Sequence, residues 1–125
     1  MRSQRTRPNK PCRYILKCGD DEVGSIDFDD FENWHCYGKL LPGASYSMYR
    51  ERLEMLASAI LREDEVLDTA SDAEVDKLAE ARTMAQDSID ALGFYLQDEL
   101  TGSTHKIHDF KLVDHGGRVY WRFDT

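Results

Sequence analysis

The spacing of hydrophobic residues changes twice along the chain, and these two changes constrain the fold more than any other feature of the sequence. Over residues 12–18 and again over 118–123, apolar and polar side chains alternate, which is typical of half-buried strands. Between these segments, from Tyr46 onward, apolar residues recur every three or four positions, which is the period of a helix packed on one side. The sequence therefore predicts strands, then helices, then strands.

The first third of the chain favours three strands. Extended segments are predicted at 12–18, 23–28 and 34–41, with the turn residues Gly19-Asp20-Asp21-Glu22 after the first and Pro42-Gly43 after the last. Because these connections are short, we expect an antiparallel meander.

Two helices are predicted next. The first begins at Tyr46, with Ser45 as its expected N-cap, and ends near the charged residues 62–65. The second opens at Ser71-Asp72-Ala73-Glu74, which has the spacing of a capping box. If unbroken to Glu99 it would be about 42 Å long, which is longer than a domain of this size. Gly93 is therefore the expected position of a kink, a bend or an early end.

The tail predicts two further strands, 105–113 and 118–123, around a hairpin turn at 114–117. The order βββααββ predicts an α+β two-layer sandwich, with an antiparallel five-stranded sheet and both helices on one face. A single domain is expected over residues 12–125, after a basic N-terminal arm at 1–11. Its predicted core includes Leu53, Leu56, Ile60, Leu78, Ile89, Trp121 and Phe123.

Charge is distributed unevenly along the 125 residues, whose formal net charge is −8. Residues 2–17 carry six bases and no acid, which leaves ten bases against 24 acids in the rest. Such an acidic body repels a phosphate backbone, so nucleic acid is expected to contact only the basic arm. The longest apolar-rich stretch, residues 91–96, is too short to span a membrane.

The sequence offers little support for catalysis or metal binding. The three cysteines, Cys12, Cys18 and Cys36, form no CxxC pair, so neither a disulfide framework nor a zinc site is expected, and the cytoplasm is the expected compartment. Cys36 and its neighbour His35 would face opposite sides of a strand, which excludes a dyad between them. We therefore expect no cofactor and favour a protein that is not an enzyme.

The second predicted helix has an acidic side opposite its apolar stripe. The acidic side contains Asp72, Asp76, Glu80, Asp87, Asp90 and Asp98, and Phe94 falls on the same side. Two interpretations remain open. The acids serve solubility while Gly93 turns Phe94 inward, or they form a binding surface for a basic protein with Phe94 as its aromatic anchor. The acidic segment from Asp20 to Glu32 is a second candidate surface.

These observations favour a non-enzymatic protein-interaction module with an acidic surface and a basic protein partner. In charge and size alone, the chain is similar to inhibitors and immunity proteins that neutralise basic toxins. The alternative is a small-molecule-binding protein or minor enzyme with a pocket between sheet and helices. The residues predicted to line that pocket are Trp34, Tyr37, Tyr46, Tyr49 and His108.

Overall fold

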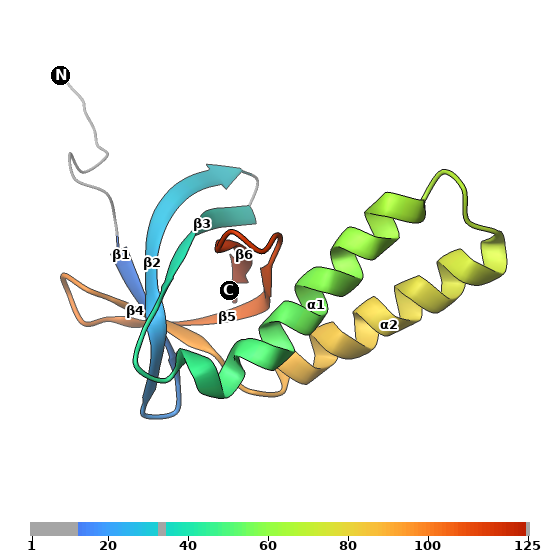
Figure 1. Cartoon of the computed structure of the whole chain (residues 1–125). Coiled ribbons are helices and arrows are strands. Elements are labelled where there is room, and N and C mark those ends of the chain that lie inside the picture. Colours follow the sequence, from blue (N-terminus) through green and yellow to red (C-terminus); the bar gives the residue numbers. More distant parts are fainter. Residues whose placement is uncertain (1–12, 33–34, 125) are drawn as a thin grey trace, which may run out of the picture.

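Six strands and two helices make up the computed structural model, which describes residues 13–32 and 35–124 (Figure 1). The elements are β1 (Arg13–Cys18), β2 (Asp21–Glu32), β3 (His35–Pro42), α1 (Tyr46–Val66), α2 (Asp72–Asp90), β4 (Tyr95–Asp98), β5 (Thr104–Leu112) and β6 (Arg118–Phe123). The predicted α+β class is confirmed. The helices lie between two sets of strands, as the changes in hydrophobic period indicate, but the second set has three strands where two were predicted.

The strands close into a barrel instead of forming an open sheet. Each half of the chain supplies an antiparallel meander, β1-β2-β3 and β4-β5-β6, and the two meanders join through the antiparallel pairs β3–β6 and β1–β4. The resulting order is β1-β2-β3-β6-β5-β4. The predicted two-layer sandwich with a five-stranded sheet is therefore wrong, because a sixth strand completes the circle.

The sixth strand is β4, in the segment where the sequence left two possibilities open, a second helix unbroken to Glu99 or one that ends early near Gly93. The helix ends at Asp90, and Gly93 follows with a φ of 74°, a left-handed conformation that glycine adopts readily. Beyond it Phe94 and Leu96 are buried, while Tyr95 between them is half-buried. Buried side chains therefore recur at every second residue, as in a strand. Leu96 also stands at helical spacing from Leu92, which is why the sequence allows the helical stripe to continue as far as Leu96.

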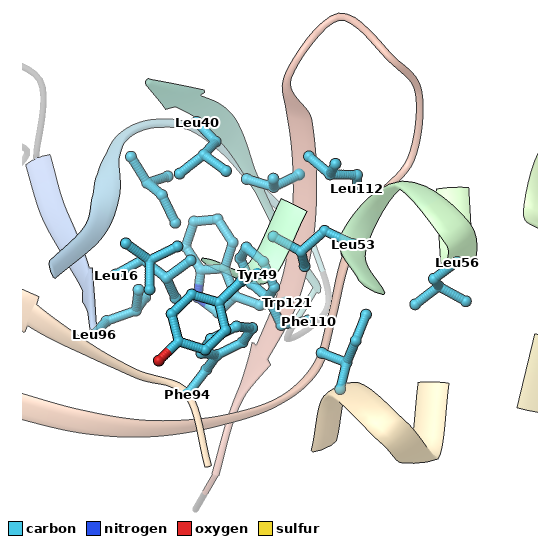
Figure 2. Packing of buried hydrophobic residues seen from close by; sticks show 14 of the residues in the cluster. Leu16, Leu40, Tyr49, Leu53, Leu56, Phe94, Leu96, Phe110, Leu112 and Trp121 are labelled. Carbon is cyan, nitrogen blue, oxygen red and sulfur yellow. The ribbon is translucent and has the colours of Figure 1, made fainter. Parts of the chain in front are cut away.

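The core fills the barrel and continues into the base of the helices. Figure 2 shows Tyr49 and Leu53 of α1 lying among the barrel residues Phe94, Phe110 and Trp121. The other buried residues of this cluster are Leu16, Val23, Ile26, Cys36, Leu40, Leu56, Ala57, Ile89, Leu96, Leu112 and Val119. Space between strands is tight: a Cβ on Gly38 would lie 2.6 Å from the Asp27 carbonyl oxygen.

The two helices form an antiparallel hairpin attached to the barrel at one end. The start of α1 and the end of α2 lie beside the barrel, and the connecting loop lies at the far end (Figure 1). No residue between Ala57 and Gln86 is buried, so the remote half is held by helix-on-helix contacts such as the 3.0 Å salt bridge from Arg82 Nε to Glu63 Oε1. Neither helix is long and apolar enough to cross a membrane.

The ends of the helices follow their local sequences only in part. The predicted capping box of α2 is present, because the Ser71 side chain accepts a hydrogen bond from the Glu74 backbone N–H and the Glu74 side chain accepts one from the Ser71 backbone N–H. Ser45 stands at the predicted N-cap position of α1, but its side chain makes no capping hydrogen bond. Leu78 is half-buried and lies outside the core cluster, whereas Ile60 and Phe123 lie at its margin.

Candidate functional site

The acidic side of α2 is open to solvent. Its residues Asp72, Asp76, Glu80, Asp87 and Asp90 are all exposed. Among the residues that the structure describes, none of the five forms a salt bridge, and Asp90 Oδ1 accepts a hydrogen bond from Gln86 Nε2 at 3.1 Å. Their charges are thus available to a partner. Asp98, predicted on the same side, belongs to β4.

Phe94 does not lie on this surface. It is only 6% exposed, and its ring centroid lies 5.6 Å from that of Tyr49 and 5.6 Å from that of Phe110. Gly93 has a left-handed backbone conformation at the end of the helix. This conformation directs the ring of Phe94, the next residue, into the core. The structure therefore matches the inward arrangement of Phe94, and the acidic side has no aromatic anchor at this position.

Met84 is the apolar residue that accompanies the acidic side. It is 65% exposed, and it follows Glu80 by four positions and precedes Asp87 by three, so the three side chains are neighbours on α2. The sequence contains a signal for this residue, because Met84 falls outside the apolar stripe of the helix. An apolar side chain that lies among exposed acids is a stronger indication of a binding surface than an apolar residue within the stripe.

The hairpin as a whole carries most of the charge and much of the exposed apolar surface. Residues 46–90 contain twelve acids and five bases, a net charge of −7 out of −8 for the chain. Large exposed hydrophobic residues of the hairpin are Met48, Met55, Leu61, Leu67 and Met84. Methionine side chains adapt to different partner surfaces because they are flexible and polarisable. We refer to residues 58–85 as the distal hairpin.

The second candidate surface, Asp20 to Glu32, is less available. Asp21 Oδ2 accepts a hydrogen bond from Tyr49 Oη at 2.7 Å, and Asp27 Oδ1 lies 2.8 Å from Arg13 Nε. Asp29 pairs with Arg118 at 3.3 Å. These carboxylates hold strands and helix together, so we favour the acidic side of α2 as the candidate site.

The structure does not bring the predicted pocket residues into one pocket. Tyr37 on β3 and His108 on β5 stand at outward-facing positions of the barrel. Tyr49 is buried and donates its hydroxyl proton to Asp21. Tyr46 alone of the described members lines a depression at the sheet–helix junction. Trp34 lies outside the described residues.

That depression is an open pocket of about 320 Å³. It is lined by Lys39, Leu40, Leu41, Pro42, Tyr46, Glu54, Leu112, His115, Gly116 and Gly117. Glu54 Oε1 lies 3.9 Å from His115 Nδ1, and burial is the main cause of a raised pKa at Tyr46. The pocket is large enough for a small polar ligand, and no arrangement of a nucleophile beside a base is seen in its lining.

The described cysteines have structural surroundings. Cys36 is buried in the barrel, and burial raises the pKa of its thiol to about 11, so it stays protonated and unreactive near neutral pH. Cys18 donates to the Leu92 carbonyl oxygen at 3.1 Å. Both are free thiols, and within 13–32 and 35–124 no three potential metal ligands form a group.

Comparison with protein-family models, with curated proteins and with solved structures finds no match for this chain. We therefore infer the function from the surfaces of the molecule.

Proposed function

We propose that the protein is a non-enzymatic interaction module whose helical hairpin binds a basic surface on a partner protein. The observation that carries this proposal is the distal hairpin itself. It extends away from the barrel (Figure 1) and contains no buried residue. Because its residues are not buried, the distal hairpin adds little to the stability of the barrel. We therefore infer that helices of this length serve binding.

The chemistry of the hairpin indicates the kind of partner. Unpaired carboxylates along one side of α2 attract lysine and arginine side chains and accelerate the encounter with a positively charged surface. Met84 lies beside them and supplies apolar contact area, which binding requires in addition to charge. This combination supports a basic protein partner.

The packing of the distal hairpin supports the same conclusion. Val66, Val75 and Leu78 are only half-buried between the two helices. Two helices without a third layer leave such side chains partly hydrated, and covering them is favourable by roughly 25 cal/mol for each Å² of apolar surface removed from water. A partner that packs on the hairpin would supply the missing layer.

Charge reversal tests this proposal with a matched control. The test variant carries Asp76→Lys, Glu80→Lys and Asp87→Lys on α2. The control carries Asp20→Lys, Glu22→Lys and Glu99→Lys on exposed barrel positions, and because Asp20 and Glu22 belong to the second candidate surface it also tests that surface. Both change the net charge equally. Each tagged variant is used to capture partners from the source cells, and association is then measured against salt concentration with the purified partner.

We expect the α2 reversal to abolish capture and to slow association about tenfold or more, while the barrel reversal leaves both close to wild type. Added salt should slow wild-type association more than it speeds dissociation. Equal losses in the two variants, or binding that is insensitive to salt, would contradict the proposal. The pocket beside Tyr46 would then favour the alternative of a small-molecule-binding protein.

A further inference from the structure

The outer side of three adjacent barrel strands differs in charge from the rest of the molecule. We call it the β3–β6–β5 face. The side chains at its outward positions are His35, Tyr37 and Lys39 from β3, Arg118, Tyr120 and Arg122 from β6, and His108 and Lys111 from β5. All are exposed or half-buried. Four of the ten bases that follow residue 17 are therefore gathered on one face.

Strand register arranges these side chains in three rows across the strands. Lys39 lies opposite Arg118 in the first row. Tyr37, Tyr120 and Lys111 form the second row, and His35, Arg122 and His108 form the third. Two rows of basic side chains thus flank a central pair of tyrosines, whose ring centroids are 5.4 Å apart.

This arrangement is unfavourable for the barrel alone. Like charges placed directly opposite on neighbouring strands destabilise a sheet, and Lys39 and Arg118 are such a pair. Asp29 and Asp109 offset part of the charge through Arg118 at 3.3 Å and Arg122 at 3.6 Å. Lys39 forms no salt bridge with any described residue. Asp27 of β2 lies opposite it on the other side, but that carboxylate pairs with Arg13 at 2.8 Å. The four cations therefore still outnumber the carboxylates that pair with them.

The two tyrosines already interact with cations through their rings. The Arg118 guanidinium carbon lies 5.7 Å from the Tyr37 ring centroid, and the Lys111 ammonium lies 5.2 Å from that of Tyr120. The Tyr120 hydroxyl also contacts His35 Nδ1. Tyrosine rings and arginine planes that lie together provide a platform on which a flat, uncharged ring can stack.

From this juxtaposition we propose that the β3–β6–β5 face binds single-stranded nucleic acid. Basic side chains contact the phosphates of the strand, and Tyr37 and Tyr120 stack with its bases, as aromatic residues do in proteins that bind single strands. An acidic protein segment would satisfy the charges and leave the central tyrosines without a role. The face lies on barrel strands and is opposite in charge to the acidic side of α2, of which Asp90 interacts electrostatically with Lys111. Its central tyrosines lie on β3 and β6, so this inference stands independently of the function proposed above.

The test measures fluorescence anisotropy of labelled ten-residue probes, oligo(dT), oligo(rU) and oligoglutamate, with the full chain at several salt concentrations. The face variants are Lys39→Glu and Tyr37→Ser, with Tyr37→Phe as the control that keeps the ring. A further variant, Arg2→Ser with Arg5→Ser and Arg7→Ser, tests the basic arm. Thermal melting of every variant accompanies the binding measurements.

We expect both nucleotide probes, or one of them, to bind more tightly than oligoglutamate. Tyr37→Ser should weaken binding about fivefold or more, and Tyr37→Phe should change it less than about twofold. Lys39→Glu should weaken binding and reduce the salt slope by about 0.7 for the lost phosphate contact. Its melting temperature should stay close to that of the wild type, because the variant gains an opposite charge across from Arg118 and loses one across from Asp27.

Several results would overturn the inference. One is equal affinity for oligoglutamate and the nucleotides, which would make the face a general site for acidic chains. Another is loss of binding in the arm variant with no effect of Tyr37→Ser or Lys39→Glu. A third is absence of nucleotide binding together with self-association that Lys39→Glu abolishes, which would assign the face to the hairpin of a second copy.

Discussion

Replacement of Phe94 by alanine is expected to lower the free energy of unfolding by about 3 to 5 kcal/mol, the usual cost of removing a buried phenyl ring. The ring is 6% exposed and lies between Tyr49 of α1 and Phe110 of β5. Its loss would leave a cavity where the helical hairpin meets the barrel. Urea unfolding followed by circular dichroism measures the change.

Met84→Ala is the matched control, because Met84 is the apolar residue exposed beside the acidic side of α2. We expect its effect on the free energy of unfolding to stay within about 0.5 kcal/mol. If Met84→Ala destabilised the protein as much as Phe94→Ala did, the burial of these two residues would have been assigned incorrectly.

Leu56→Ala and Leu78→Ala should differ clearly in the free energy of unfolding that they cost, although both remove a leucine side chain of the hairpin. Leu56 is fully buried at the base of α1, so its replacement should cost about 2 to 5 kcal/mol. Leu78 is half-buried in the distal hairpin, where the neighbouring side chains can readjust, so its replacement should cost about 1 kcal/mol. The same urea titrations provide both values.

Equal costs for the two leucines would mean that the distal hairpin is packed as firmly as its base. The proposed function would then lose the support of the half-buried side chains between the helices, and only the exposed residues Leu61, Leu67 and Met84 would offer apolar surface to a partner. A larger cost at Leu56 agrees with a hairpin that is anchored at one end.

Local patterns in the sequence were sufficient to predict the helices and most strands. The capping box at Ser71 and Glu74 marks the start of α2, and the alternation of Val119, Trp121 and Phe123 marks β6. Closure of the barrel could not be predicted in this way. It depends on β4, four residues whose buried Leu96 also satisfies the helical period, and on pairing with β1 at a separation of about eighty residues.

The candidate site was predicted in part. Helical spacing alone places Asp76, Glu80 and Asp87 together, and the structure shows them exposed. The position of Phe94 could not be derived, because it depends on the conformation of Gly93. The rows of the β3–β6–β5 face could not be derived either, because they require the register between β3 and β6, which lie about eighty residues apart in the sequence.

Hydrogen–deuterium exchange of the protein alone and in complex with its captured partner shows whether the partner binds the distal hairpin. In the free protein, amides of the distal hairpin should exchange faster than those of the barrel strands, because few buried contacts oppose their opening. In the complex, exchange should slow over residues 58–85 and stay unchanged in β1, β2 and β4. Protection confined to the barrel, with the hairpin exchanging as in the free protein, would contradict the proposal that the hairpin binds the partner.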